Sequence, residues 1–413
     1  MDEKQEQPLS SPLHFYRCAH APSCGGCQQQ QIPYDEQLRK KQAVVENLFF
    51  PSTAKLMPII PCATFWEYRN KMEYSFSQDK AGKRFLGLML VKGRGRVFNL
   101  QECHLTSSWF TRTLAAVREW WEESGLAAYR PYRNEGHLRT LILREGKRTG
   151  DKLAMLTVSG NPRFPFTRTQ IQTFVKAISK GAHDKDSLSI FLRVQQAIKG
   201  QPTQFFEMHL AGPGYLREEI DIDLGDQTTT LFLKISPSSF FQPNTSQAAV
   251  LYSKALQLLA LSKEDEVFDL YCGTATLGLL ASLQAGKVTG IELNPHAILD
   301  AEENKRLNGV DNLDLYCGDV GQVLLQLKSQ KNIKNSPRAV IIDPPRAGMS
   351  PQAIEHVLSL KAQKILYISC NPKTQKENID ALSALYRPDV LQPVDQFPHT
   401  NHIENIALLS LTI

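Results

Sequence analysis

The regular alternation of apolar runs and helix-like stretches after Glu264 constrains the fold of this chain more than any other feature. Short runs rich in aliphatic and β-branched residues predict seven strands, at 267–271, 287–293, 313–317, 339–343, 364–369, 390–397 and 404–411. Stretches of helical character separate the first six of them, at 277–285, 295–308, 320–329, 351–361 and 372–386. Such a rhythm predicts a seven-stranded, Rossmann-like α/β domain with an open parallel sheet covered on both faces, whose last two strands pair antiparallel.

The first half of the chain has a less regular pattern. We expect strands at 71–76, 85–91, 140–144, 153–158 and 205–210, with helices at 107–123 and 167–179, which together predict an α+β domain. An earlier helix-like stretch, 34–50, places Leu38, Val44, Val45 and Leu48 roughly on one face. The 413 residues therefore divide into a predicted domain at 1–235 and another at 236–413, and we leave open that the helix at 34–50 packs on the second.

The charge is distributed unevenly. The whole chain has a formal net charge of +5, but residues 61–150 alone contain 16 Lys and Arg against 9 Asp and Glu, a net +7. A basic segment that includes Arg69, Lys71, Arg94 and Arg96 is typical of a surface that binds a phosphate backbone, although a solvated charged face fits the count equally well. No apolar run reaches the roughly 18 residues of a membrane span, and the first residues lack signal-peptide features, so we expect a cytoplasmic protein without membrane contact.

Polar residues follow the predicted strands of the second domain at the points where ligands bind in open α/β sheets. The first strand runs into a turn of small residues between Asp269 and Thr276, and the next two end at Glu292 and Asp319. The turn lacks the Gly-x-Gly-x-x-Gly pattern of nicotinamide-dependent enzymes. Five polar strand ends in register, in a sheet of seven strands, instead predict an S-adenosylmethionine-dependent methyltransferase.

Cys370 is the candidate nucleophile. It ends the apolar run 364–369, and Asn371 and Pro372 supply a good N-cap and first helical position. Free backbone N–H groups and the dipole at a helix N-terminus favour a thiolate over a thiol. A buried, unreactive cysteine is the alternative for any single Cys, and the other polar strand ends are what favour the catalytic interpretation.

Three of the eight cysteines form a C-x5-C-x2-C run, Cys18, Cys24 and Cys27, and Cys103 is a candidate fourth member. In a reducing compartment such a group predicts metal ligands rather than disulfides. Four thiolates suit either zinc or an iron–sulfur cluster, and the spacing alone does not distinguish the two.

Several motifs together resemble the RNA uracil-C5 methyltransferases, which make 5-methyluridine in ribosomal and transfer RNA. The similarity runs along the whole chain, in the cysteine pattern and in Tyr68-Arg-Asn-Lys71, Ser239-Phe-Phe-Gln-Pro-Asn244, Asp269-Leu-Tyr-Cys-Gly273, Asp343-Pro-Pro-Arg346, Ser369-Cys-Asn-Pro372 and Phe397-Pro-His-Thr-x-His402-x-Glu404. The combination is highly specific, although each motif alone is not. This chain departs from the family pattern at Ala275, where the family usually has glycine.

The resemblance implies that Cys370 is the nucleophile and Glu404 the base. Uracil C5 is a poor nucleophile, but a thiolate that adds to C6 turns C5 into an enolate carbon that can accept a methyl group, after which a base must remove the C5 proton. The resemblance further implies a [4Fe–4S] cluster on Cys18, Cys24, Cys27 and Cys103. The positions that match those used around the cofactor and reaction centre are Gln242, Tyr271, Thr276, Glu292, Asp319 and Asp343.

The resemblance implies an RNA substrate and no obligate protein partner. We expect 23S ribosomal RNA, because relatives that modify the T-loop of transfer RNA often lack the cysteine pattern. The transfer RNA T-loop remains an alternative, as does a non-catalytic RNA-binding or assembly factor on the same scaffold, which the presence of both Cys370 and Glu404 disfavours. Some relatives carry an N-terminal RNA-binding barrel, and we expect none here because 17 residues precede Cys18.

Overall fold

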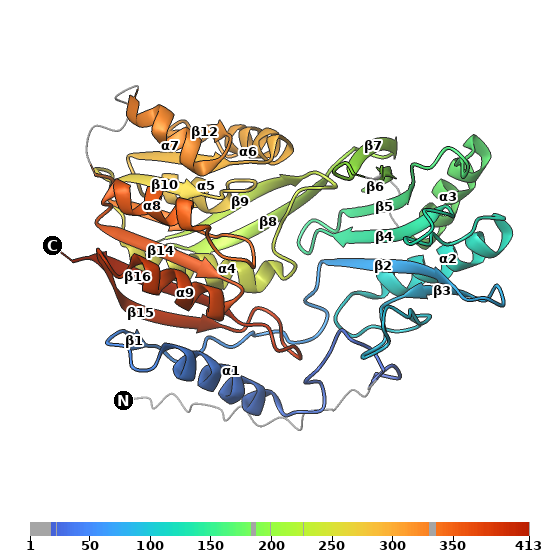
Figure 1. The fold of residues 1–413 in the computed structure, drawn as a ribbon, viewed down its shortest axis with the longest axis horizontal. Helices are drawn as coiled ribbons and strands as arrows, with labels where there is room; N and C mark the ends of the chain where they lie inside the picture. Colours follow the sequence, from blue (N-terminus) through green and yellow to red (C-terminus); the bar gives the residue numbers. More distant parts are fainter. Residues whose placement is uncertain are drawn as a thin grey trace, which may run out of the picture.

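The computed structural model describes residues 18–21, 23–182, 187–198, 200–225, 227–329 and 336–412. Figure 1 shows two lobes, each built on its own sheet, with the two-stranded ribbon β8–β9 extending between them. The C-terminal part of the chain forms the lobe with the larger sheet. Among the described residues, no helix combines the length and the apolar character that crossing a bilayer requires.

The larger sheet has the strand order β1-β15-β16-β14-β13-β10-β11-β12. Neighbours from β14 to β12 are parallel, and the last two strands, β15 and β16, pair antiparallel, as predicted. Strand β16 also runs antiparallel to β14. The sheet therefore has eight strands in the described residues, not the predicted seven, because a short strand from the N-terminal part pairs with β15. The strands are β1 (Lys55–Leu56), β10 (Glu266–Leu270), β11 (Lys287–Glu292), β12 (Leu313–Cys317), β13 (Ala339–Ile342), β14 (Lys364–Ser369), β15 (Tyr386–Val394) and β16 (Glu404–Leu411).

Both faces of this sheet are buried, which explains why its strands read as continuous apolar runs. Along β14, Ile365 and Tyr367 belong to one hydrophobic core, while Leu366 and Ile368 belong to the core on the opposite face. The helices that follow β9 and intervene between the strands are α4 (Thr245–Leu259), α5 (Thr276–Ser282), α6 (Pro295–Leu307), α7 (Val320–Ser329), α8 (Pro351–Leu360) and α9 (Pro372–Leu382). The last of these ends earlier than predicted because β15 already begins at Tyr386.

Helix α1 (Tyr34–Phe49) lies against α9 of the C-terminal lobe. The predicted apolar face is confirmed for Val45 and Leu48, which pack on the core, and wrong for Val44, which is 46% exposed. The buried stripe of the helix is Gln37, Lys41, Val45 and Phe49. Val45 and Phe49 pack into the core that contains Tyr367, whereas the two polar members of the stripe bind a loop described below. A helix that binds another segment through buried polar groups does not reveal its face by hydrophobicity alone.

The smaller sheet has the order β3-β2-β4-β5-β6-β7, with two helices packed on one face. Its elements are β2 (Lys71–Gln78), β3 (Arg84–Gly87), α2 (Ser108–Glu123), β4 (Leu138–Glu145), β5 (Lys152–Ser159), α3 (Arg168–Gly181), β6 (Leu188–Gln196) and β7 (Gln204–Ala211). The ribbon strands β8 (Leu216–Asp223) and β9 (Thr228–Ile235) share a core with α4. Sequence reasoning missed β6 and β8, and in β8 buried residues alternate with outward-facing ones. Domain limits at 235 and 236 remain a prediction.

Candidate active site

The order of the large sheet brings the polar strand ends to one edge. Parallel strands β12, β11, β10, β13 and β14 are successive neighbours, so the residues that end or follow them line the same carboxyl edge. In that order, these residues are Asp319, Glu292, Tyr271, Asp343 and Cys370. The sequence-derived candidates from distant parts of the chain therefore share one rim of the sheet.

Glu404 lies next to Cys370 because β16 runs antiparallel to β14. Ser369 pairs with Asn405, so the residue that follows Ser369 is level with the first residue of β16. Residues directly opposite each other on neighbouring strands have Cβ atoms about 5 Å apart. Glu404 is only 3% exposed, whereas Cys370 is half-buried and remains accessible.

The groups around Cys370 shift the pKa of its thiol in opposite directions. Burial raises the pKa of the thiol, and the nearby Glu404 carboxyl raises it further, while a hydrogen bond and the positive charge of Arg346 lower it. The net shift of the pKa is upward, so burial and the Glu404 carboxyl outweigh Arg346, and the effect of the helix N-terminus stays a prediction. The guanidinium of Arg346 also lies 3.2 Å from Nδ1 of His402. It therefore contacts both Cys370 and the segment that leads to Glu404.

The turn after Cys370 is held rigidly. Asn371 accepts a hydrogen bond from the backbone N–H of Lys373 at 3.3 Å and Pro372 begins α9, as the sequence predicted. The fully buried Gln375 donates to the carbonyls of Tyr367 and Asn405, at 2.8 and 3.0 Å. One side chain of α9 therefore joins β14 to β16, and so fixes Cys370 relative to Glu404.

Asp343 and Glu404 are two carboxyl groups with raised pKa values at this edge of the sheet. Burial raises the pKa of Asp343 to about 7. Burial and the neighbouring Asp343 also raise the pKa of Glu404 well above its usual value, with Arg346 acting in the opposite direction. A carboxylate with a raised pKa is a better proton acceptor at neutral pH than an exposed one. A buried carboxyl group with a raised pKa therefore lies beside the thiol.

The turn after β10 has room for a ligand against its backbone. Tyr271, Gly273 and Ala275 all have positive φ, at 64°, 57° and 58°. No atom lies within 4 Å of the position that a Cβ on Gly273 would occupy. Glu292 accepts hydrogen bonds from the N–H groups of Gly273 at 3.0 Å and Asn294 at 2.8 Å. A tight turn with an acidic side chain at its edge suits a nucleoside cofactor.

The remaining candidates lie around the same rim. Thr276 is the buried first residue of α5, and the exposed Asp319 caps α7 by accepting a hydrogen bond from the N–H of Gln322 at 3.2 Å. Gln242 comes from the segment before α4, where its buried side chain hydrogen-bonds the hydroxyl of Tyr252. Two residues earlier, Phe240 is 62% exposed. An exposed aromatic ring beside the site can stack on a nucleobase.

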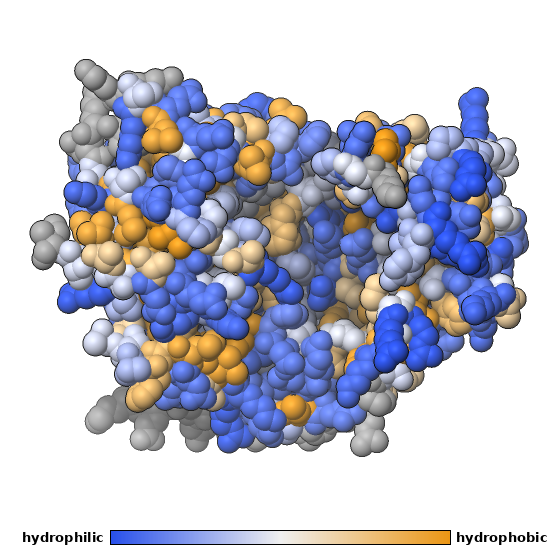
Figure 2. All heavy atoms as spheres, viewed as in Figure 1, coloured by the Kyte–Doolittle hydropathy of each residue, from blue (hydrophilic) through white to orange (hydrophobic). Residues whose placement is uncertain are grey.

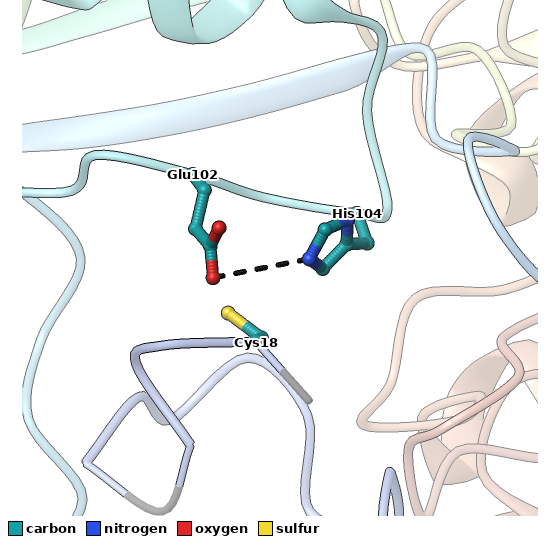
Figure 3. A group of neighbouring side chains, drawn as sticks. All are labelled: Cys18, Glu102 and His104. Carbon is teal, nitrogen blue, oxygen red and sulfur yellow. Dashed lines mark ion pairs between the residues drawn. The ribbon is translucent and has the colours of Figure 1, made fainter. Parts of the chain in front are cut away.

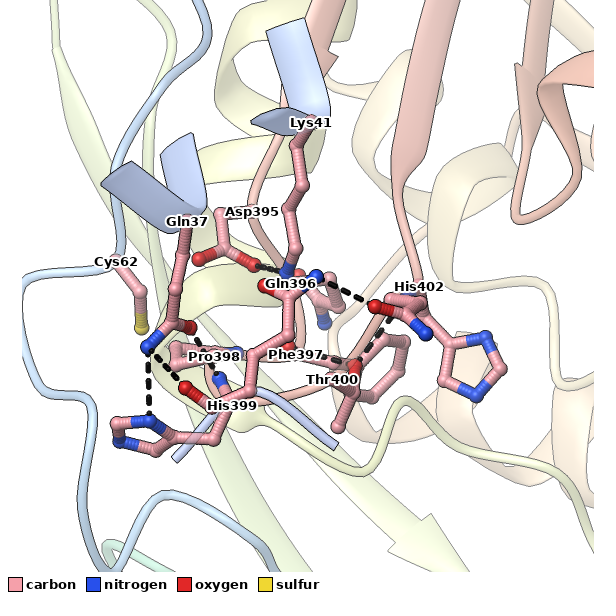
Figure 4. Close-up of polar contacts among 12 residues, drawn as sticks. Gln37, Lys41, Cys62, Asp395, Gln396, Phe397, Pro398, His399, Thr400 and His402 are labelled. Atoms are coloured by element: carbon pink, nitrogen blue, oxygen red, sulfur yellow. Dashed lines mark hydrogen bonds and ion pairs between the residues drawn. The ribbon is translucent and has the colours of Figure 1, made fainter. Parts of the chain in front are cut away.

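Residues 395–403, here called the 395–403 loop, connect β15 to Glu404 at the start of β16. Side chains of α1 hydrogen-bond this loop (Figure 4). Lys41 forms a buried ion pair with Asp395 at 2.6 Å and donates to the carbonyl of Phe397 at 3.0 Å. Gln37 accepts from the N–H of His399 at 2.8 Å, and its amide donates to the carbonyl of Gln29 at 3.1 Å. Helix α1 therefore links this loop to the segment that follows the cysteine run.

The predicted metal ligands Cys18, Cys24, Cys27 and Cys103 line one cavity of about 40 Å³. Burial raises the pKa of Cys27 to about 12, with the three other thiols as further causes, so all four sulfurs are close enough to interact. Figure 3 shows that Glu102 and His104 also approach Cys18, with one ligand atom of each within 4.8 Å of the others. The donor set fits a thiophilic metal or cluster.

Some residues of the site were not recognised as such from the sequence. Lys41 and Gln37 were overlooked because polar residues on a helix normally indicate its exposed face. Glu102 and His104 flank Cys103 directly, so proximity in sequence was an available signal. Arg346 was noted only as the residue after two prolines, and its contact with Cys370 depends on the packing of two strand ends.

Comparisons with known proteins agree with this geometry. A family model described as tRNA (uracil-5-)-methyltransferase matches residues 211–412. An uncharacterised RNA methyltransferase of Protochlamydia amoebophila (strain UWE25) is 49% identical over 402 residues, which cover 95% of this chain and 90% of the relative. Another, from Chlamydia trachomatis serovar D, is 35% identical over 402 residues, which cover 96% of this chain and 99% of the relative.

A solved structure extends the similarity to the smaller sheet. The Pyrococcus abyssi tRNA (uracil-54, C5)-methyltransferase, crystallised with S-adenosyl-L-homocysteine, is similar with a TM-score of 0.70 and 26% sequence identity. The match covers 94% of this chain and 86% of that one, so it includes both lobes.

Proposed function

The chain belongs to the RNA methyltransferase family of these relatives, and on that premise we propose that it is a uracil-5-methyltransferase, which methylates C5 of uridine in RNA through a covalent adduct with Cys370. The observation that carries the proposal is the pairing of β14 with β16, which makes a half-buried thiol and a buried carboxyl group neighbours. As the sequence suggests, we also propose that it acts in the cytoplasm.

In this mechanism each side chain at the site has one task. The Cys370 thiolate adds to C6, which forms the S–C6 bond and moves the C5–C6 π electrons toward the C4 carbonyl. The enolate carbon C5 then takes the methyl group. Glu404 removes the C5 proton, the S–C6 bond breaks and the thiolate leaves. Arg346 supports the thiolate, because its positive charge and hydrogen bond lower the pKa of Cys370.

S-adenosylmethionine is the cofactor that fits the rim, and when bound it supplies an electrophilic methyl group. The residues that would hold it are those around the open turn and its neighbours, namely Gln242, Tyr271, Thr276, Glu292, Asp319 and Asp343. The space beside Gly273 and the acidic group at Glu292 support this assignment.

We propose 23S ribosomal RNA as the substrate, because the resemblance associates the four-cysteine pattern with that type of enzyme. Transfer RNA is the second candidate, and the similarity to the Pyrococcus abyssi enzyme supports it. Mapping 5-methyluridine in RNA from cells with and without the gene separates the two. Loss at one or two positions of 23S RNA is expected. Loss only in transfer RNA would change the substrate, and no loss would favour a non-catalytic factor.

The covalent step has its own test. Cys370→Ala should abolish methylation while affinity for S-adenosylmethionine stays nearly unchanged, because the thiol contacts the uracil ring rather than the cofactor.

Glu404→Gln should accumulate an RNA–protein adduct that survives a denaturing gel, since the C5 proton can no longer be removed. Cys317→Ala, which removes an exposed thiol, is the matched control. Residual turnover by Cys370→Ala, or normal turnover by Glu404→Gln, would contradict the assigned roles.

We further propose that the four-cysteine cavity holds a [4Fe–4S] cluster. A single zinc ion with bonds of about 2.3 Å would draw its sulfur ligands to roughly 3.8 Å from one another. In the part of the chain described here, three potential ligand atoms lie within 4.8 Å of one another in a group that combines Cys18 with Glu102 and His104. No such group among the described residues contains three cysteines. A wider arrangement of thiols suits a cluster better than one ion.

Metal analysis of protein purified without oxygen tests this assignment. We expect a brown protein that absorbs near 400 nm and contains about four iron and four sulfide per chain, following the composition of the cluster. Cys24→Ser should bleach it, and the exposed-thiol variant Cys317→Ala should not. A colourless wild-type protein with one bound zinc would show that the cavity is a zinc site.

A further inference from the structure

The edge strand β7 exposes apolar side chains on both of its faces. Phe205, Phe206 and Met208, here called the β7 surface, are 52%, 54% and 52% exposed. Strand β7 is the last strand of the smaller sheet, and among the residues that the structure describes no further strand pairs with its outer backbone edge. Proteins usually protect such an edge with charged residues or proline, and a solvent-facing cluster of large apolar side chains marks an interaction site.

The β7 surface lies beside the segment that carries Gln242. The guanidinium of Arg193, on β6, is 5.5 Å from the ring centroid of Phe205 and donates to Ser238 at 2.6 Å. Glu207 of β7 pairs with Arg193 at 2.7 Å and also accepts a hydrogen bond from Ser238. Two residues after Ser238 comes Phe240, whose ring is exposed. Through Arg193 and Ser238, the face of β7 that carries Phe205 is therefore linked to the segment that carries Phe240 and Gln242.

Positive charge adjoins this path. Lys71, Arg144 and Arg193 lie near one another. Burial, and next to it the positive charge of Arg144, lowers the pKa of Lys71 to about 8. Arg144 is 4% exposed, and its Nε has no hydrogen-bond partner among the described residues. The acidic groups that also face these cations are Glu73, Glu207 and Asp300. Of the three cations, Arg193 lies beside the ring of Phe205 and is the one that a phosphate next to a stacked base would approach.

We propose that the β7 surface binds a single-stranded segment of the RNA that flanks the target uridine, with nucleobases stacked on Phe205 and Phe206. This inference rests on the proposed function and adds to it a second contact area outside the reacting pocket. Aromatic rings next to cations form the usual platform for single-stranded nucleic acid, since every base has a face that can stack. The link to the segment that carries Phe240 and the adjacent cations favour RNA over a protein partner.

The test compares RNA binding and methylation by the wild-type enzyme and a Phe205→Ala/Phe206→Ala/Met208→Ala variant. A fluorescein-labelled 15-nucleotide oligouridylate is the binding probe, read by anisotropy. We expect its Kd to rise at least about tenfold, as the loss of one or two stacked bases predicts. With unfractionated RNA from cells lacking the gene, KM should rise, whereas kcat at saturating RNA should stay within about twofold because the catalytic pair is untouched.

Phe50→Ala is the matched control, because Phe50 is 80% exposed and follows α1 at the opposite side of the molecule (Figure 1). It should leave Kd and KM unchanged. An unaltered affinity for S-adenosylmethionine shows that the triple variant is folded, and Phe205→Ala alone provides a milder second variant. If the wild-type enzyme methylates no RNA, the proposed function is wrong, whatever β7 does.

Two results would overturn the β7 proposal while leaving the proposed function intact. In the first, the triple variant methylates and binds RNA like the wild-type enzyme. In the second, RNA affinity is unchanged but light scattering shows that the wild-type protein is a dimer and the triple variant a monomer. The surface would then be a contact between two copies of the chain.

Discussion

At the scale of single residues, the reactivity of Cys370 is a balance between burial and charge. Burial and Glu404 raise the pKa of the thiol, and Arg346 lowers it. Removal of water protects an adduct but disfavours the thiolate that must form it. The Arg346 guanidinium offsets part of this cost, because it is positive at every working pH and hydrogen-bonds the sulfur, although the net pKa shift of the thiol stays upward.

Arg346→Met should therefore slow adduct formation most strongly at neutral pH. Without the guanidinium the pKa of Cys370 rises further, and each unit reduces the thiolate fraction tenfold as long as the pH lies below that pKa. In single-turnover experiments we expect a loss of about tenfold at pH 7 that diminishes as the pH rises. Arg346→Lys, which keeps the charge, should lose less. A loss of equal size at every pH would mean that Arg346 acts by another route.

At the scale of elements, α1 stabilises a loop rather than only covering a sheet. The stripe Gln37, Lys41, Val45 and Phe49 repeats every four residues, and its polar half binds the 395–403 loop while its apolar half enters the core. Tyr34 adds a hydrogen bond to Asp395 at 2.9 Å (Figure 4 shows the neighbouring contacts). Because Glu404 follows this loop directly as the first residue of β16, the helix helps to fix the position of Glu404.

Lys41→Met should destabilise the protein by about 3–5 kcal/mol, because the carboxylate of Asp395 stays buried after its charged partner is removed. The side chains of the pair are 2% and 0% exposed, so water cannot compensate. Adding Asp395→Leu to Lys41→Met should restore part of the stability. Lys40→Met, which breaks the exposed pair with Glu36 on the same helix, should change it by less than about 1 kcal/mol. Denaturant unfolding measures all three variants, and equal effects of Lys40→Met and Lys41→Met would refute the argument.

At the scale of the whole molecule, a few polar residues join the two lobes. Asn70 of the N-terminal lobe donates to the carbonyl of Gln242 at 2.9 Å and to the hydroxyl of Thr245 at 2.8 Å. Thr245 in turn donates to the buried Glu218 of the ribbon at 2.8 Å. Nearby, Arg144 donates to backbone carbonyls of the segment between β9 and α4. The smaller sheet therefore positions the segment that carries Gln242 and Phe240. Figure 2 shows a hollow between the two lobes on this side.

Asn70→Ala should raise KM for RNA and for S-adenosylmethionine severalfold, because the segment around Gln242 loses two hydrogen bonds. Those bonds should cost about 2 kcal/mol of stability, roughly 1 kcal/mol each. Asn312→Ala is the control, because the Asn312 amide also donates to backbone carbonyls, those of Ser282, Ala285 and Gly286 at 3.0, 3.0 and 3.3 Å, but lies just before β12 at the amino edge of the sheet. It should lose similar stability with unchanged KM. Equal kinetic effects of the two variants would show that Asn70 is merely structural.

Most of the large sheet was predictable because its signals are local. Each apolar run such as 364–369 specifies a strand by its own composition, and Asn371 and Pro372 begin the next helix without help from the rest of the chain. The eighth strand, β1, was not predictable, since two residues, Lys55–Leu56, carry no periodicity and pair only because β15 offers an edge. The burial of Gln37 and Lys41 on α1 was not predicted for the same reason, because these polar residues find their partners in a loop more than 350 positions away.

The sequence by itself therefore determined the order of strands and helices, the residue types at the strand ends and the four cysteines, because each depends on nearby residues. Only the tertiary structure decided that Arg346 reaches the thiol and that α1 holds the 395–403 loop. It also decided the net direction of the shift at Cys370. Burial and the charges of distant segments set that shift, and neither exists until the chain has folded.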